Sequence, residues 1–316
     1  MPAVPCNLYP CPLMMLAFLQ AGPPPEPEPF NILEPLLEYV GFAAWFAIFG
    51  AIGFRFAVLR GGLGNGGDAV SEPAERTAGR IGLIGAALLV LRLLLNAART
   101  AGERHIGFVE ALQRGGARTL VPLACAVVLL VASGLVLGRV KAGWWIALLA
   151  GAVLVLRNVT TGRWFSVVNP LHEAGASLWI GTLFVLMAAG IASVLRHAAS
   201  PEARGELTAT MVSRFSPLAL GAASLLGITG VITAVRHLKR WESLWTTAYG
   251  YAFDVKLLLV VCVVAMGAWN WRRMRPKLGD EAGALAIRRS ARTELLFAGL
   301  VLLVTGILVS LPAPRG

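Results

Sequence analysis

Long apolar runs separated by short polar segments dominate the pattern of this chain. A helix needs about 20 apolar residues to cross the hydrocarbon core of a bilayer. Eight runs approach or exceed that length, and they lie near residues 35–59, 80–98, 119–138, 141–157, 167–195, 213–235, 250–272 and 293–311. The runs are continuous rather than alternating, and a helix satisfies its own backbone hydrogen bonds in lipid. The pattern therefore predicts an all-α, polytopic membrane bundle of about eight transmembrane helices.

Two segments between these runs have an amphipathic pattern. Residues Arg236–Tyr249 place Leu238, Trp241 and Trp245 at helical spacing, with basic residues between them. The segment Glu103–Leu112 repeats its apolar residues in the same way. Such helices lie in the membrane interface, where tryptophan is a common anchor. We expect both segments to be interfacial anchors rather than binding sites.

The composition agrees with a membrane protein and excludes an ordinary soluble one. Hydrophobic residues make up 57% of the chain and charged residues 14%, and the mean hydropathy is +0.70. The net charge is +11, but the basic residues lie between apolar runs and do not form the soluble basic face of a nucleic-acid-binding protein. With the N-terminus outside, inner loops carry 16 Lys and Arg and outer segments carry 10. The positive-inside rule therefore predicts both termini outside.

The chain divides by composition into three parts. Residues 1–34 contain a short apolar stretch without basic residues before it, and then the proline-rich linker Pro23–Pro29. This part is signal-like or mis-started, because a start at Met14 or Met15 is equally consistent. We predict one four-helix membrane half over residues 35–166 and a second over residues 167–316.

Two motifs resemble those of enzymes but lack the context that the chemistry needs. Gly62 to Gly67 fits the G-x-G-x-x-G pattern, yet it follows a membrane span instead of a strand, so we interpret it as a flexible loop. His172-Glu173 begins like the zinc-protease motif H-E-x-x-H, but Ala176 stands where the second histidine is needed. No catalytic constellation is present in the sequence, and we predict that the protein is not an enzyme.

The second half of the chain carries a set of motifs in a recognisable order. They are Leu171-His172, Leu178-Trp179-Ile180-Gly181, Arg214-Phe215-Ser216-Pro217, Thr229-Gly230, Thr247-Ala248-Tyr249-Gly250, Lys256, Asn270, Arg288-Arg289-Ser290 with Glu294, and Leu311-Pro312. From about residue 168 to 313 this pattern resembles the CopD family, the integral membrane copper resistance proteins D. The family usually has a second glycine where this chain has Thr182.

The resemblance implies copper transport across the bacterial cytoplasmic membrane, in copper homeostasis or resistance, with copper ion as the substrate. It also implies a periplasmic copper-binding partner of the CopC type. Family members are associated with both uptake and resistance, and we favour uptake. The matching residues Trp179, Gly181, Arg214, Phe215, Tyr249, Gly250, Lys256, Asn270 and Glu294 are expected to be structural, because none of them is a soft copper ligand.

Candidate copper ligands are present among the other residues. Thiolate and thioether groups suit Cu(I), and imidazole and carboxylate groups suit Cu(II). His172 and Glu173 lie at the outer end of the predicted fifth span, and His237 follows the outer end of the sixth, so the three are predicted to meet at one mouth. Cys262 and Met266 are four residues apart on the seventh span and share a helix face. We predict that they could pass Cu(I) inward, although both residue types are also ordinary apolar fillers.

Charged residues inside the spans need partners, because a charge at the bilayer centre is costly. Arg214 and Glu294 lie at similar depth on the inner side, and we predict an ion pair between them. Lys256 is predicted either to reach outward or to face a carboxylate such as Glu173. Arg92 is predicted to point into the bundle.

Two alternatives to a copper transporter remain open from the sequence. A haem- or quinone-linked membrane redox protein would need paired histidines, and His172 with His237 is the pair at matched depth. A non-transporting membrane scaffold would only dock a periplasmic copper chaperone.

Overall fold

The computed structural model describes residues 32–64, 67–157, 167–237, 242–270, 272 and 281–311. All of its helices belong to the compact unit Leu33–Gly316. The predicted all-α fold is confirmed, since the described residues contain helices and connecting turns and no strand. Seven helices among them are long and apolar enough to cross a membrane. The predicted run at 141–157 also forms a helix, but it is a shorter one of 16 residues. The orientation of the termini and the division into halves stay predictions.

Each predicted run corresponds to one helix or one continuous series of helical segments. Their bounds are α2 Leu33–Gly53 with the π-helical turn η1 Phe54–Val58, α3 Asp68–Glu103, α4 Phe108–Gly115, α5 Ala117–Leu137, α6 Ala142–Arg157, α7 Val168–Ala176, η3 Ser177–Gly181, α8 Thr182–Val185, η4 Leu186–Ile191, α9 Ala192–His197, α10 Pro201–His237, α11 Ser243–Thr246, α12 Ala248–Trp269 and α13 Glu281–Ser310. The segment from α7 to α9 is one span in which π-helical turns alternate with α-helical ones.

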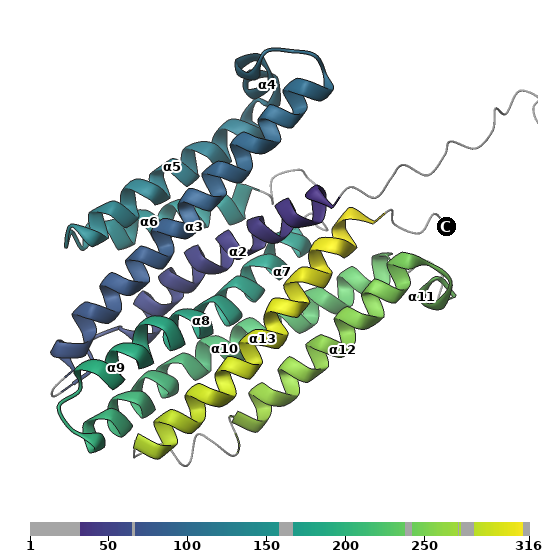
Figure 1. Cartoon of the computed structure of the whole chain (residues 1–316). Helices are drawn as coiled ribbons and strands as arrows, with labels where there is room; N and C mark the ends of the chain where they lie inside the picture. Colours follow the sequence, from purple (N-terminus) through teal and green to yellow (C-terminus); the bar gives the residue numbers. More distant parts are fainter. Residues whose placement is uncertain are drawn as a thin grey trace, which may run out of the picture. The chain divides into compact units, whose positions relative to one another are not determined.

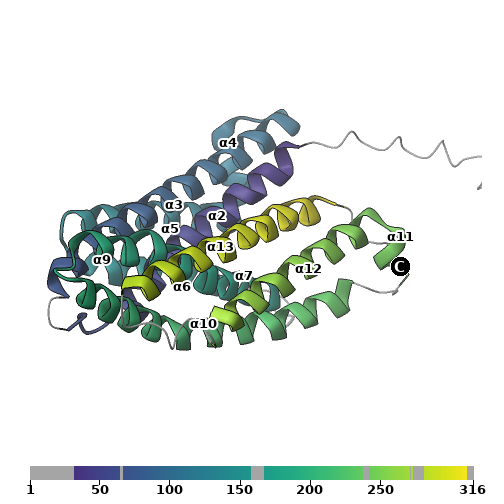
Figure 2. The same ribbon diagram turned by 60° about the horizontal axis from the view of Figure 1, so that its bottom comes forward.

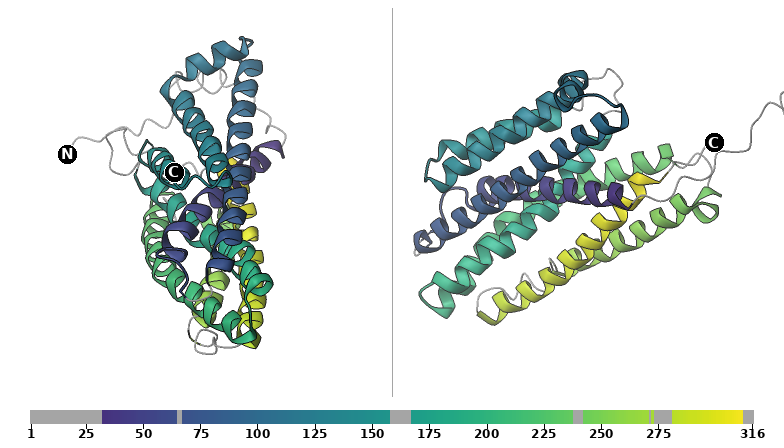
Figure 3. Two further views of the ribbon diagram at one scale, coloured as in Figure 1. Left: turned by 90° about the vertical axis from the view of Figure 1, so that its left-hand side faces the viewer. Right: turned by 45° about the horizontal axis from the view of Figure 1, so that its top comes forward.

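Helix α2 packs against α3, which follows it in the chain, and also against helices from later in the chain. It contacts α3 along its length, and it also contacts η3, α8 and α13 (Figures 1 and 2). Helices α5 and α6 form a hairpin that packs on α3, whereas α12 and α13 form a second hairpin (Figure 3). Helix α2 with η1 and the α7–α9 span contribute a large part of the buried core, which includes Phe54, Val185, Leu186 and Ile191.

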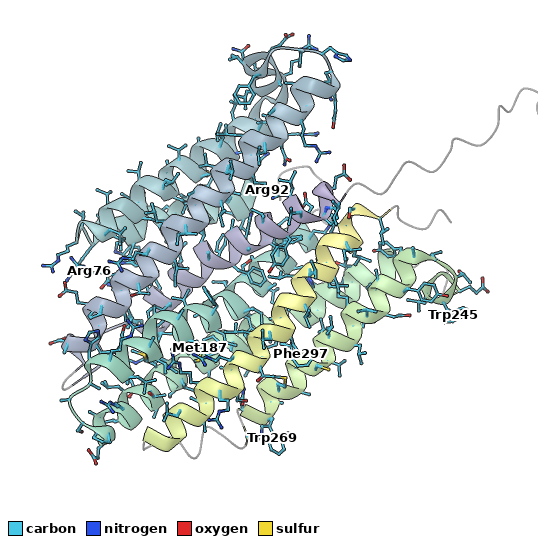
Figure 4. The ribbon with its side chains drawn as sticks, in the orientation of Figure 1. Arg76, Arg92, Met187, Trp245, Trp269 and Phe297 are labelled. Carbon is cyan, nitrogen blue, oxygen red and sulfur yellow. The ribbon has the colours of Figure 1, made fainter. Side chains whose placement is uncertain are left out.

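The outer faces of the spans are apolar, as expected for a lipid-facing surface. Leu258 and Val261 on α12 are 65% and 63% exposed. Trp245 and Trp269, both 59% exposed, lie at opposite ends of the α11–α12 segment (Figure 4). Tryptophan is enriched at both interfaces of a membrane. The two residues thus mark a stretch of suitable length for crossing a bilayer.

The two predicted interfacial helices have different outcomes. Helix α4 overlaps the second half of the second predicted segment and continues beyond it to Gly115; its Phe108 and Val109 are exposed, and an ion pair joins Glu110 and Arg114. Of the segment Arg236–Tyr249, the structure describes the end of α10, the short helix α11 and the start of α12, and Leu238 and Trp241 lie outside the described residues.

The closest helix crossing joins α2 to η3 through two glycines. A methyl group on Gly50 would overlap the carbonyl group of Gly181, and one on Gly181 would overlap the carbonyl of Phe46. The two backbones are therefore in direct contact, which small residues permit in membrane proteins. Glycine at position 181, quoted above as part of the CopD-like pattern, is a requirement of this crossing.

Thr182 stands beside the crossing, where the family pattern has a second glycine. Its side chain is fully buried, and its Oγ1 points at the Cα of Gly53 on α2, where any side chain would collide with it. The crossing remains close here because the glycine is on the partner helix instead. Gly53 thus supplies the space that the second family glycine would otherwise give.

Candidate functional site

His172 lies one turn into α7 and faces α10. Its Nδ1 is 3.1 Å from the Oγ1 of Thr229, and the Cε1 of its ring would be 3.3 Å from a methyl group on Gly230. The Thr229 hydroxyl donates its own proton to the carbonyl of Leu225 at 2.7 Å. When the hydroxyl donates in this way, its oxygen accepts from the ring, and the proton of a neutral imidazole is then on Nδ1. This tautomer leaves the lone pair on Nε2, the form in which histidine binds a metal.

Glu173, the next residue, has a different environment. The charged groups that interact with it are Arg92 of α3 and Glu38 of α2. Arg92 donates to both carboxylate oxygens of Glu38 at 2.7 Å, and its guanidinium lies against Gly41, where a side chain would collide with it. Figure 4 labels Arg92 on α3, beside α2. The predicted inward orientation of Arg92 is confirmed, and its partner Glu38 was missed by the sequence analysis although a carboxylate within an apolar run is itself a signal.

Lys256 of α12 is half-buried and interacts electrostatically with His172. It makes no ion pair with Glu173 among the described residues. His172 and Thr229 are in contact between α7 and α10, and Lys256 acts on His172 electrostatically from α12; we refer to the three residues as the His172 cluster. Glu38, Arg92 and Glu173 form a neighbouring charged cluster on the α2 side.

The predicted metal ligands are only partly placed by the structure. Within the described part of the chain, no group of three or more His, Cys, Asp and Glu side chains is arranged to hold a metal ion. The side chain of His237 lies outside the described residues, so neither its meeting with His172 and Glu173 nor the haem alternative is tested. Cys262 and Met266 lie one turn apart on α12, both half-buried, and Cys262 is a free thiol. Their role as copper ligands stays a prediction.

A second polar cluster connects η3, α12 and α13. Glu294 is 4% exposed and accepts a hydrogen bond from Asn270 Nδ2 at 3.0 Å, while the Ser290 hydroxyl donates to Asn270 Oδ1 at 2.5 Å. A methyl group on Gly267 would be 3.5 Å from Glu294 Oε1 and 3.7 Å from the indole ring of Trp179. Three of the residues named for the family resemblance, namely Trp179, Asn270 and Glu294, thus lie around one point of α12.

The predicted ion pair between Arg214 and Glu294 is wrong. Arg214 Nη1 donates to the carbonyl oxygens of Val58, Arg60 and Gly62, at 3.2, 2.7 and 2.6 Å. Gly61 and Gly62 have φ values of +71° and +77°, a backbone conformation in which the loop turns its carbonyls toward α10. Similar depth in the membrane did not make Arg214 and Glu294 neighbours, because α10 places Arg214 beside the loop that follows η1.

This geometry predicts that Arg214→Lys loosens the loop. A lysine ammonium can reach one carbonyl but cannot present the planar guanidinium, and we expect a loss of about 1–2 kcal/mol in the free energy of unfolding. Trypsin should then cleave after Arg60, which is exposed, several times faster than in the wild type. The matched control is Arg196→Lys on the exposed end of α9. Equal cleavage rates in the two variants would contradict this role for Arg214.

The other residues of the pattern make capping and packing contacts in the described chain. Thr247 caps the N-terminus of α12 by accepting a hydrogen bond from the backbone N–H of Gly250 at 3.0 Å. Gly250 is buried and Tyr249 is half-buried. Phe215, at 8% exposure, belongs to the main apolar core.

Comparison with known proteins agrees with the resemblance. Residues 209–308 match the family model described as "Copper resistance protein D". We refer to these matched residues as the CopD region. The chain is also 28% identical over 166 residues to "Copper transport protein CutJ" of Bacillus subtilis (strain 168), a match that covers 52% of this chain and 28% of that protein. No solved structure is significantly similar to the chain.

The CopD region extends from α10 to α13 and contains most of both polar clusters. Thr229 and Lys256 of the His172 cluster lie in it, as do Asn270, Ser290 and Glu294 of the second. The remaining members, His172 and Trp179, come from the preceding α7–α9 span. The CopD region therefore completes both clusters only together with this span.

Proposed function

We propose that the protein moves copper ions across the bacterial cytoplasmic membrane, in copper homeostasis or resistance, with uptake as the favoured direction. The match of residues 209–308 to the CopD family supports this proposal most strongly. The similarity to a copper transport protein and the seven helices long enough to cross a membrane also support it. A periplasmic copper-binding protein of the CopC type is proposed as the donor, because the resemblance implies one.

His172 is the proposed first copper ligand within the spans. Its Nε2 carries the lone pair, because Thr229 holds the proton on Nδ1. Hydrogen bonding of the second ring nitrogen orients a metal-binding histidine and raises its basicity. Imidazole is an accepted ligand for copper, and a site with a single fixed imidazole binds weakly enough to release the ion.

The test is copper entry into sealed proteoliposomes, with Cu(I) and Cu(II) added separately. We expect flux above that of protein-free vesicles, and we expect His172→Ala to reduce it at least about tenfold, the range typical of a lost ligand or its hydrogen-bonding partner. Thr229→Val should reduce flux less, because the imidazole remains but its tautomer is no longer fixed. The preferred ion would identify the oxidation state that is transported.

The matched control is His197→Ala, because His197 is the exposed histidine at the end of the same span. Its flux should equal that of the wild type. If neither ion enters faster than into protein-free vesicles, the transport proposal fails. The hypothesis to test next is then that the protein docks a periplasmic copper chaperone. If His172→Ala and His197→Ala transport equally, transport stands without His172 as a ligand.

A further inference from the structure

Glu294 is a buried carboxyl that copper binding does not use in the proposal above. It lies on α13, nine residues after Leu285 at the start of the Leu285–Ser310 span, or about 14 Å of helix rise. Only 4% of its surface is exposed. An ionisable residue at such a position is costly and is a candidate for function.

The neighbours of Glu294 are arranged to donate to it. Ser290, one turn earlier on the same helix, donates to the Oδ1 of Asn270, which fixes the amide so that Nδ2 donates to Glu294 Oε2. A carboxylate can accept this bond, and so can the carbonyl oxygen of a neutral carboxyl group. The amide therefore satisfies Oε2 in both protonation states.

The other carboxyl oxygen lies beside an apolar part of the described chain. Oε1 is directed at the Cα of Gly267 on α12, beside the indole of Trp179 from η3. The groups that face the carboxyl are thus Asn270 and Gly267 of α12, Trp179 of η3 and, through Asn270, Ser290 of α13. Among the described residues, no Lys, Arg or His forms an ion pair with Glu294, and no charged side chain there acts on it. A bound proton can therefore neutralise the carboxylate of Glu294 in place of a basic side chain.

We propose that Glu294 is a proton-binding site within the membrane. A proton delivered from water forms an O–H bond at Oε1 and leaves a neutral acid; on release this bond breaks and the proton returns to water. The hydrogen bond from Asn270 to Oε2 persists through both steps. Coupling of this proton to copper movement rests on the proposed transport function and would supply its driving force.

The test is infrared difference spectroscopy of the full-length protein in lipid vesicles across a pH series. The wild type should show the C=O stretch of a protonated carboxyl that appears and disappears reversibly with pH and shifts in heavy water. This band should be absent from Glu294→Gln and present in Glu294→Asp. Asn270→Leu should change its frequency, because the C=O group loses a donor. Glu206→Gln, at an exposed position of α10, is the matched control and should retain the band.

A band that persists in folded Glu294→Gln, or its absence from the wild type, would overturn the proposal. Folding of each variant is checked by size-exclusion chromatography, and Glu294→Asp provides a folded variant that still contains the acid. Copper flux is measured in parallel with a pH indicator inside the vesicles. If the carboxyl band of Glu294 changes with pH but no copper enters the vesicles, the proposed transport function is rejected and the proton-binding site stands. If copper enters the vesicles but the carboxyl band is unchanged in Glu294→Gln, the proton-binding site is rejected and the transport function stands.

Discussion

Gly181→Ala should lower the free energy of unfolding by more than about 3 kcal/mol, because the added methyl group meets backbone atoms. At this position the methyl would overlap the carbonyl of Phe46, and Gly50 lies against the same turn of η3. A side chain can rotate away from an inserted methyl group, but the backbone of a packed helix cannot. The α2 helix would have to separate from the α7–α9 span, which contains much of the buried core. Unfolding in mixed micelles of increasing denaturing detergent measures this loss.

The matched control is Gly227→Ala on α10. No atom lies within 4 Å of a methyl group at this position, so alanine should be neutral or stabilise the helix by about 1 kcal/mol. The same substitution thus has opposite expected effects at two glycines of the bundle. If Gly181→Ala unfolds at the same detergent fraction as Gly227→Ala, helix α2 and η3 do not pack backbone against backbone.

The spans could be predicted from the sequence because burial in lipid leaves a simple hydropathy signal. The ends of the helices could not, since hydropathy marks the apolar part of a helix and not its length. The run predicted near 213–235 belongs to α10, which begins at Pro201, and the run near 80–98 belongs to α3, which begins at Asp68. The π-helical turns η3 and η4 were not predicted, because they depend on how neighbouring helices pack.

The site was less predictable, because it depends on contacts between helices. The motif Thr229-Gly230 was visible in the sequence, but its contact with His172 required the relative position of α7 and α10. Equal depth predicted an Arg214–Glu294 pair, and the structure gave each a different partner. Position along a span can be read from a sequence, whereas the facing residue on another span cannot.

Glu38→Gln should cost about 3–5 kcal/mol of unfolding free energy, because it leaves the Arg92 charge without its partner. Both carboxylate oxygens of Glu38 accept hydrogen bonds from Arg92. The side chain of Arg92 is only 19% exposed and that of Glu38 29%, on spans that face lipid. Glu173 is then the remaining carboxylate of the cluster, and it makes no direct ion pair with Arg92 among the described residues, so the half-buried guanidinium is poorly stabilised. Glu103→Gln is the matched control, since Glu103 is 66% exposed and lies 3.7 Å from Arg99, and its effect should be below about 1 kcal/mol.

A double-mutant cycle separates the value of the pair from the cost of breaking it. The variant with both Glu38→Met and Arg92→Met removes both charges of the pair, and methionine fits irregular apolar space. We therefore expect it to unfold at a higher detergent fraction than either single variant, since replacing a buried pair by apolar residues is often nearly neutral. If the double variant is instead the least stable of the three, the pair stabilises the bundle directly. The bidentate contact between α2 and α3 would then be a structural element of the bundle.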